Sequence, residues 1–319
     1  MNPRTIEAFK VVSSMVRLVE AGLDPVDGRA RGVTVGVWLA GSRPRTWPAA
    51  IVPVIVGTSA AQSQPDMVRA VLALLVAMGL QVGVNYANDY SDGVRGTDDQ
   101  RIGPMRLVAS GNASPASVKR AAFCAFGISA IVGLYLASVT TWWLLLVGGS
   151  AITAAWCYTG GPKPYGYRGL GELFVFIFFG LVASAGSTYV QDEEITALAI
   201  GAAVPVGLLA VALLITNNLR DIPGDTVAGK RTLAVRMGDR PTRALYLVVV
   251  LMAILCLPYL ALLRPAALLG LLATPLAIKP IRLIVQGVSG QQLIPVLAAT
   301  GKFQMVYGLL LCCGLGSGI

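Results

Sequence analysis

The chain has 319 residues, of which 55% are hydrophobic and only 13% are charged, and its mean hydropathy is +0.70. Soluble domains carry about 25% charged residues, so this composition excludes an ordinary water-soluble enzyme and indicates an integral membrane protein. No His is present, which excludes His-based acid–base catalysis and His-ligated metal. Ala, Leu, Gly and Val dominate without strand-like alternation, so we predict an all-α fold rather than a barrel.

The net charge of +9 does not indicate a nucleic-acid partner. The basic residues lie between apolar segments, as expected for loops on the cytoplasmic side of a membrane. The five Cys lie in apolar runs without metal-ligand or redox spacing, so we interpret them as packing residues.

Residues 1–34 precede the first long apolar segment and are predicted to be an N-terminal extension. Within it, residues 4–23 could form an amphipathic helix on the membrane surface, or the whole extension could lack a chemical role; the second interpretation is favoured. Residues 35–319 are then predicted to be the transmembrane domain.

Apolar segments between these limits predict about nine transmembrane helices. If the N-terminus lies inside, every Lys and Arg except Arg69 and Arg264 falls on the cytoplasmic side. This bias predicts the orientation of the spans. We expect a multi-pass protein of the cell membrane with its active site facing the cytoplasm. The predicted spans are 47–63, 68–88, 115–138, 141–160, 169–190, 195–218, 242–263, 265–286 and 302–318.

Two acidic clusters stand out because they close two of these spans on the cytoplasmic side. The first is Asn88-Asp89-Tyr90-Ser91-Asp92, followed by Asp98, and the second is Asn217-Asn218-Leu219-Arg220-Asp221, followed by Asp225. Each contains an Asn four residues before an Asp, and the clusters lie four spans apart. Two four-helix halves plus one further helix would explain this weak repeat, although the match covers few residues and chance similarity is the alternative.

Helical spacing indicates which of these side chains share a face. Asn217, Asp221 and Asp225 are spaced i, i+4, i+8, so they project together if the helix continues past the span. Asn85, Asn88 or Asp89, and Asp92 follow a similar stripe. Asp98 does not, and a bend at Gly93 and Gly96 would be needed to bring it back.

Gathered carboxylates beside basic residues indicate a site for Mg²⁺ and phosphate. Mg²⁺ prefers oxygen ligands and often bridges carboxylates to substrate phosphates, whereas like charges without a cation disfavour one another. The alternative is an ordinary solvated loop with helix-capping Asp and Asn, which two similar clusters on one membrane face make less attractive. The cations available for the remaining phosphate charge are Arg101, Arg106, Lys163, Lys230 and Arg231.

Two further segments lie on the same side. Tyr158, in Tyr158-Thr159-Gly160-Gly161, could offer its ring face to a developing cation, or it could be an interfacial aromatic residue. Arg45, before the first span, could bind an acidic co-substrate or simply anchor the helix.

The stretch from Asn85 through Asp98 and on to Arg101-Ile102-Gly103-Pro104-Met105-Arg106 resembles the UbiA superfamily of intramembrane prenyltransferases. Asn217 through Asp225, followed by Gly229-Lys230-Arg231-Thr232-Leu233, is similar to the second motif of that family. Most closely the chain resembles the MenA branch, which prenylates 1,4-dihydroxy-2-naphthoate. The superfamily pattern has an Asp eight residues after the first motif Asn; here Gly96 takes that place and the acid comes at Asp98, as in that branch.

The resemblance implies a bundle of UbiA type and a polyprenyltransferase activity. The implied partners are a polyprenyl diphosphate, 1,4-dihydroxy-2-naphthoate and membrane lipid, and the implied cofactor is Mg²⁺. The expected reaction ionises the allylic C–O bond of the donor, joins the ring to the prenyl group and releases CO₂, giving demethylmenaquinol. The expected metal ligands are Asp89, Asp92, Asp98, Asp221 and Asp225. The residues expected to bind substrate, ligate metal or orient carboxylates are Asn85, Asn88, Asn217 and Asn218.

Two rival interpretations remain at this stage. One is an ion-coupled secondary transporter, but transporter sites lie near the bilayer midplane, whereas these acids lie at the cytoplasmic ends of spans. The other is a different UbiA-type enzyme, such as one that prenylates 4-hydroxybenzoate.

Overall fold

The computed structural model describes residues 34–97, 103 and 105–317, and all regular structure in this part of the chain is helical. The predicted all-α class is therefore confirmed. The predicted N-terminal extension falls almost wholly outside the described residues, as do Asp98 and Arg101.

Six helical spans are long and apolar enough to cross a membrane, which makes the chain a multi-pass membrane protein. A seventh is a pair of helices, η4 (Pro265–Ala273) and α12 (Pro275–Val285), bent by 48°. The apolar helices α3 (Pro48–Ser59) and α6 (Trp143–Cys157) are shorter, so the predicted count of nine full spans is not confirmed. The six are α4 (Met67–Val94), α5 (Pro115–Val139), α7–η3–α8 (Gly171–Asp192), α9 (Ala197–Val227), α11 (Asp239–Ala261) and η5–α13 (Gly290–Gly316).

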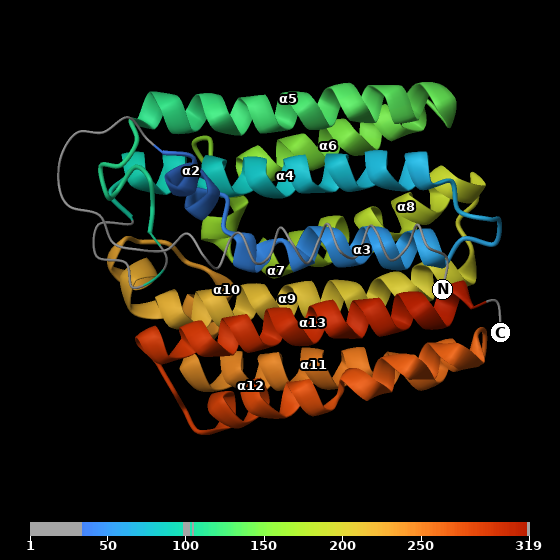
Figure 1. Ribbon diagram of the computed structural model, residues 1–319. Coiled ribbons are helices and arrows are strands. Elements are labelled where there is room, and N and C mark those ends of the chain that lie inside the picture. The colour runs from blue at the N-terminus through green and yellow to red at the C-terminus, as the bar shows by residue number, and fades with distance from the viewer. Residues whose placement is uncertain (1–33, 98–102, 104, 318–319) are drawn as a thin grey trace.

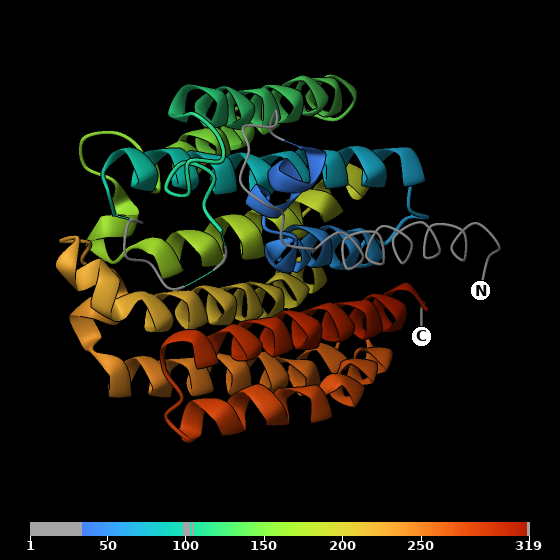
Figure 2. The ribbon, with the colours of Figure 1, turned by 60° about the vertical axis from the view of Figure 1, so that its left-hand side comes forward.

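The long helices lie side by side along one direction (Figure 1). Helix α9 lies in the middle, between the helices of the N-terminal part and the C-terminal helices α11, α12 and α13 (Figure 2). Within the apolar part of α9, 72% of the residues are buried in the protein, against 22% for α4 and 28% for α5. The apolar side chains of α4 and α5 therefore face lipid, whereas those of α9 form the core with α3, α11 and α13.

Close backbone contact fixes the helices beside α9. The π-helical segment η3 (Phe176–Val182) crosses α9 at Gly180 and Gly207, where a Cβ on Gly180 would lie 2.5 Å from the Cα of Gly207. Any side chain at either position would push the helices apart, so this pair holds the α7–η3–α8 span against α9.

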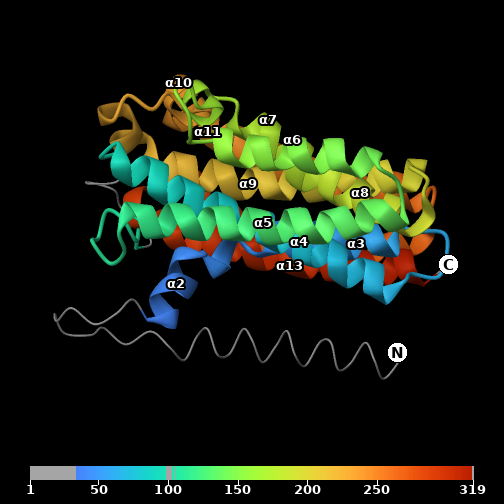
Figure 3. The same ribbon diagram turned by 90° about the horizontal axis from the view of Figure 1, so that it is seen from above.

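Helices α4 and α9 both end on the same side of the bundle, at the left of Figure 1. Short elements gather at that end: η1 (Pro44–Thr46), η2 (Tyr165–Arg168) and α10 (Leu233–Met237). Helix α2 (Val35–Gly41) projects from the bundle when it is seen from above (Figure 3). The ends of α4 and α9 carry the two acidic clusters, so the topology brings the clusters together.

Candidate active site

A cavity of about 470 Å³ lies between α4, α6, η3 and α9 and extends to the acidic clusters, where Asp92 and Asp221 line it. Most of its wall is apolar, with Phe174, Phe178 and Phe179 on one side and Leu144 and Leu145 on another. All its charged and amide side chains except Gln81 belong to the motif ends of α4 and α9 or to the adjoining loops. The charged and amide residues are Arg43, Gln81, Asn85, Asn88, Asp92, Arg106, Asn217, Asn218, Asp221 and Lys230, and the further polar lining residues are Thr46, Ser129, Tyr158, Tyr165 and Ser187.

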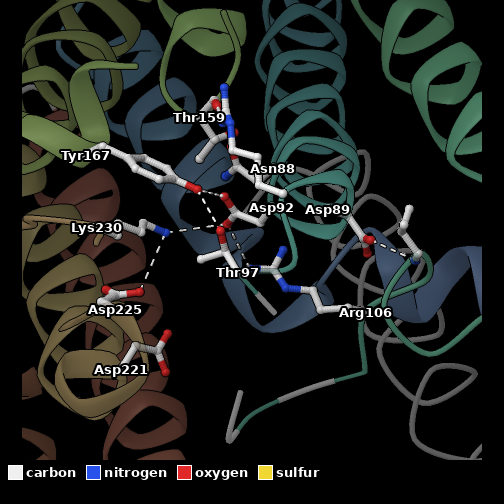
Figure 4. Close-up of polar contacts among 12 residues, drawn as sticks. Asn88, Asp89, Asp92, Thr97, Arg106, Thr159, Tyr167, Asp221, Asp225 and Lys230 are labelled. Carbon is white, nitrogen blue, oxygen red and sulfur yellow. Dashed lines mark hydrogen bonds and ion pairs between the residues drawn. The ribbon is translucent and has the colours of Figure 1, made fainter. Parts of the chain in front are cut away.

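Asp92 is the carboxylate of the first cluster that faces this cavity. Its side chain is 1% exposed, and its Oδ1 accepts a hydrogen bond of 2.8 Å from the Tyr167 hydroxyl. Its Oδ2 lies 3.4 Å from Lys230 Nζ and 3.8 Å from Arg106 Nη2 (Figure 4). Three side chains from three segments thus converge on one buried carboxylate.

Asp89 has a different environment. Its two oxygens accept hydrogen bonds from the backbone amides of Leu107 (2.8 Å) and Val108 (3.0 Å). Figure 4 shows it turned away from Asp92, Asp221 and Asp225. In this structure Asp89 binds the loop after α4 to the helix. Of the two alternatives that the helical stripe left open, Asn88 lines the cavity and Asp89 does not.

The neighbouring asparagines are held by loops from elsewhere. The Asn88 Oδ1 accepts from the Thr159 hydroxyl at 2.8 Å, and the Asn85 Nδ2 donates to the Ser42 carbonyl at 2.8 Å. Both asparagines line the cavity. The segments containing Ser42 and Thr159 are therefore tied to the same face of α4.

The second cluster lies on one helix, as its spacing predicted. Helix α9 continues unbroken to Val227 and carries Asn217, Asp221 and Asp225. Arg220 donates two hydrogen bonds to the Asp221 carboxylate, Nε to Oδ1 at 2.7 Å and Nη2 to Oδ2 at 2.8 Å. Such a bidentate pair fixes the Asp221 carboxylate at the cavity.

Lys230 connects the two clusters. Its Nζ lies 3.4 Å from Asp92 Oδ2 and 3.9 Å from Asp225 Oδ1, and its side chain is only 12% exposed (Figure 4). One ammonium group thus balances a carboxylate from each motif.

Only some of the other basic residues that were predicted to bind phosphate or an acidic co-substrate line the cavity. Arg106 is 7% exposed and lines the cavity with Lys230. Lys163, Arg231 and Arg45 are exposed and do not line it. Arg43, two residues before Arg45, lines it instead, with the left-handed backbone conformation that non-glycine residues rarely adopt (φ 54°).

Tyr158 lines the cavity and belongs to a group of aromatic residues in its wall. Its ring packs edge-to-face on Tyr165 at 5.5 Å, and Tyr165 stacks on Phe174 at 4.0 Å. Tyr158 is half-buried, and these aromatic contacts place it in the cavity wall.

Sequence reasoning missed Tyr167. Its ring lies between the guanidinium of Arg95 (5.3 Å) and the ammonium of Lys230 (5.1 Å). Burial raises the pKa of Tyr167, and the adjacent Asp92 carboxylate raises it further, so the phenol remains a donor to Asp92. Arg95 also donates to the carbonyls of Thr159 and Gly161. The signal in the sequence was an Arg directly after the first cluster and a Tyr-rich loop, which no spacing rule connects.

The bend after the first cluster occurs at one of the two predicted glycines. Gly96 has φ 72° and follows the end of α4, whereas Gly93 stays inside the helix. A Cβ on Gly93 would lie 2.6 Å from Val108. The absence of a side chain at Gly93 therefore lets the loop that contains Val108 pack against α4, and Gly93 does not bend the chain.

The donor set fits Mg²⁺. The cavity-facing ligands are carboxylate and amide oxygens, the type that Mg²⁺ prefers. Within the described ranges, no three Asp, Glu, His or Cys residues form a group able to hold a metal unaided.

Comparison with known proteins agrees with this geometry. The UbiA prenyltransferase family matches residues 50–301. The chain belongs to the UbiA prenyltransferase family. It is 48% identical to the 1,4-dihydroxy-2-naphthoate octaprenyltransferase of Mycobacterium tuberculosis, over 88% of this chain and 97% of that protein. It is 38% identical to the Escherichia coli enzyme of the same name, over 87% and 94%.

The UbiA fold is also shared with solved structures. A UbiA homologue from Archaeoglobus fulgidus, solved with DMAPP and Mg²⁺, has a TM-score of 0.58 at 17% identity, covering 86% of this chain and 99% of that one. The predicted UbiA-type architecture is thereby confirmed.

Proposed function

We propose that this chain transfers a polyprenyl group from polyprenyl diphosphate to 1,4-dihydroxy-2-naphthoate, with loss of the acceptor carboxylate as CO₂, and so makes demethylmenaquinol. The observation that carries the proposal is the cavity itself, which is mostly apolar and is lined by Asp92 and Asp221 from two distant motifs. Its polar end suits a diphosphate with its metal, and its apolar end suits a prenyl chain. Relatives at 48% and 38% identity carry the name of this activity.

The polar end of the cavity is suited to the diphosphate group of the prenyl donor. Asp92, Asp221 and Asp225 would hold Mg²⁺, with Asn88 and Asn217 as neighbouring oxygen donors. When bound, the metal would neutralise the diphosphate as it leaves. Lys230 and Arg106 lie against Asp92 and are placed to neutralise further negative charge.

The loops around this end hold the carboxylates in place. Tyr167 donates to Asp92, and Arg220 holds Asp221, so neither carboxylate has to reorganise when the substrate enters. Asp89 keeps the loop carrying Arg106 against α4 through the two amides that it binds. We therefore assign Asp89 to positioning rather than to metal ligation.

The side chains of the cavity wall are placed to stabilise the allylic cation that forms when the diphosphate leaves. Tyr158 presents an aromatic ring to the cavity, and aromatic faces stabilise cations. Phe174, Phe178 and Phe179 keep water from the cation, which would otherwise be hydrolysed. The ring of the acceptor then bonds to the allylic carbon, and the C–C bond to its carboxylate breaks to release CO₂.

Arg43 is the best-placed residue for the acceptor carboxylate. It lines the cavity beside Thr46 and Asn85, whereas Arg45 points to solvent. A guanidinium matches a carboxylate through two parallel hydrogen bonds, which would orient the acceptor ring.

We further propose that the chain resides in the cell membrane with this cavity facing the cytoplasm. The support is the distribution of Lys and Arg, which leaves only Arg69 and Arg264 on the opposite side.

The test compares two acceptors with the purified protein, a polyprenyl diphosphate and Mg²⁺. We expect turnover of 1,4-dihydroxy-2-naphthoate and none of 4-hydroxybenzoate, and removal of Mg²⁺ with EDTA should abolish turnover. Turnover of 4-hydroxybenzoate alone would favour a different UbiA-type enzyme, and activity that survives EDTA would contradict the metal assignment.

A further inference from the structure

One buried carboxylate near the cavity belongs to neither motif. Glu172 lies in the first turn of α7 (Gly171–Val175), within a membrane-spanning segment, and is 8% exposed. Ionisable residues within membrane spans are rare and usually have a function or a partner.

Glu172 has a single side-chain partner among the described residues, and that partner lines the cavity. Its Oε1 accepts a hydrogen bond of 2.9 Å from the Nδ2 of Asn218, while no described residue donates to its Oε2. Both residues are buried, so this bond is shielded from water.

The bond determines how the Asn218 amide is oriented. A carboxylate oxygen needs a donor, so the NH₂ end of the amide must face Glu172. The amide is planar, and the opposite end therefore carries Oδ1 away from Glu172. Because Asn218 lines the cavity and no described residue donates to its Oδ1, this oxygen remains available to a ligand.

Packing keeps Glu172 in register with Asn218. At Gly171, a Cβ would lie 3.2 Å from the Tyr158 ring and 3.3 Å from Leu214, so α7 starts in close contact with two cavity-lining residues. Leu214 is one helical turn before Asn218 on the same face of α9.

The charge and hydrogen-bonding capacity of the Asn218 Oδ1 indicate which group it would bind. An amide oxygen with a carboxyl group behind it repels a diphosphate and attracts a hydrogen-bond donor. Asn218 is also one turn deeper in the membrane than Asp221, on the side of the aromatic residues. The acceptor of the proposed reaction carries hydroxyl groups, and the donor carries none.

We propose that Glu172 is a positioning residue that holds Asn218 with its Oδ1 toward the cavity, where it accepts a hydrogen bond from a hydroxyl of the aromatic acceptor. This inference rests on the proposed function for the identity of the acceptor. Asn218 thereby differs in role from Asn217, its neighbour in the motif.

The experiment measures steady-state kinetics for 1,4-dihydroxy-2-naphthoate and Mg²⁺-dependent binding of geranyl thiolodiphosphate, an unreactive donor analogue. Glu172→Leu and Asn218→Ala should each raise the KM for the acceptor or lower kcat/KM by about tenfold, the effect of one hydrogen bond. Glu172→Gln keeps an acceptor oxygen for Asn218 and should restore most of the activity. Asp239→Asn is the control, since Asp239 is also in the first turn of a helix but is paired with Arg243 away from the cavity.

Binding of the donor analogue should be unchanged in all four variants. The double variant Glu172→Leu/Asn218→Ala should have nearly the same kcat/KM for the acceptor as Asn218→Ala, because the two residues act through one interaction. If Glu172→Leu does not fold, Glu172→Ala takes its place, and unchanged acceptor kinetics in that variant would overturn the positioning role.

Unchanged acceptor kinetics in Asn218→Ala would overturn the proposal. Weakened binding of the donor analogue would also overturn it, since Asn218 would then serve the metal or the diphosphate. The proposed function fails differently, through absence of product with the wild-type protein.

Discussion

At the scale of single residues, Asp92 and Asp221 are the carboxylates that this account requires for the donor. Asp92→Asn and Asp221→Asn should each lower activity by roughly 10³-fold, about 4 kcal/mol of transition-state stabilisation, because an amide is a poorer metal ligand and carries no charge. The measurement is product formation at saturating Mg²⁺ with protein of verified thermal stability.

Asp239→Asn again provides a matched control, since Asp239, like Asp221, is paired with an Arg through Nε and Nη2. It should retain normal activity. Near-normal activity in either site variant would refute the metal role.

Substitution of Asp89 should lower the stability of the protein more than its activity. Asp89→Asn replaces one of two acceptor oxygens with an NH₂ group, which leaves the amide of Leu107 or Val108 without an acceptor. A buried unsatisfied donor costs about 1–3 kcal/mol, so we expect a lower unfolding temperature and a smaller loss of activity than in Asp92→Asn. Unchanged stability with an equal loss of activity would mean that Asp89 is a metal ligand after all.

This contrast marks a limit of the sequence for single residues. Asp89 and Asp92 are three residues apart on one helix, and spacing assigns both to similar faces. The difference arises from the loop around Leu107, whose path depends on contacts far along the chain. Arg43 and Arg45 are a similar case, because the short turn at η1 decides which guanidinium reaches the cavity.

At the scale of elements, the loop between α6 and α7 holds the first motif from outside. Tyr167→Phe removes the donor to Asp92 Oδ1 but keeps the ring between Arg95 and Lys230. We expect activity to fall by about tenfold, in line with one hydrogen bond to a charged group.

The pH profile tests the same contact. Burial raises the pKa of Tyr167, so its hydrogen bond to Asp92 is present below the ordinary tyrosine pKa of about 10 and is lost only as the pH rises through a higher value. The ratio of wild-type to Tyr167→Phe activity should therefore be constant from about pH 7 to pH 9. A ratio that approaches one near pH 9 would show that the phenol ionises earlier.

The elements were predictable to different degrees. Apolar segments of about 20 residues located the long spans, and the i, i+4, i+8 spacing correctly extended α9 past Asn217. The short helices α3 and α6 were not distinguished from full spans, because hydropathy averages over the turns that end them. The π-helical segment at Phe176–Val182 has no signature in the sequence apart from its glycine.

At the scale of the whole molecule, the orientation follows from the distribution of charge. Lys163 lies in the exposed loop before α7, at the site end, and Glu194 lies in the exposed loop between α8 and α9. In a cysteine-free background, Lys163→Cys should react with an impermeant maleimide only from the cytoplasmic side, and Glu194→Cys only from the opposite side. The measurement uses right-side-out and inverted vesicles, and a reversed pattern would contradict the proposed orientation.

The two distant motifs were predicted to lie on a common membrane face, and in the structure Asp92 and Asp221 line one cavity. Asp225 does not line it and is connected to Asp92 through Lys230. The role of Lys230 as the link between them depends on the fold of the chain after α9. No local pattern predicts that link, because it joins residues that are far apart in the sequence.

The central claim is that this cavity joins a prenyl group to the naphthoate ring as the carboxylate leaves. The most direct measurement follows ¹³CO₂ released from carboxyl-labelled 1,4-dihydroxy-2-naphthoate, together with the mass of the lipid product. We predict one CO₂ for each prenylated product, with Mg²⁺ required and with the yield abolished in Asp92→Asn. A prenylated product that retains its label, or no product from this acceptor, would contradict the account.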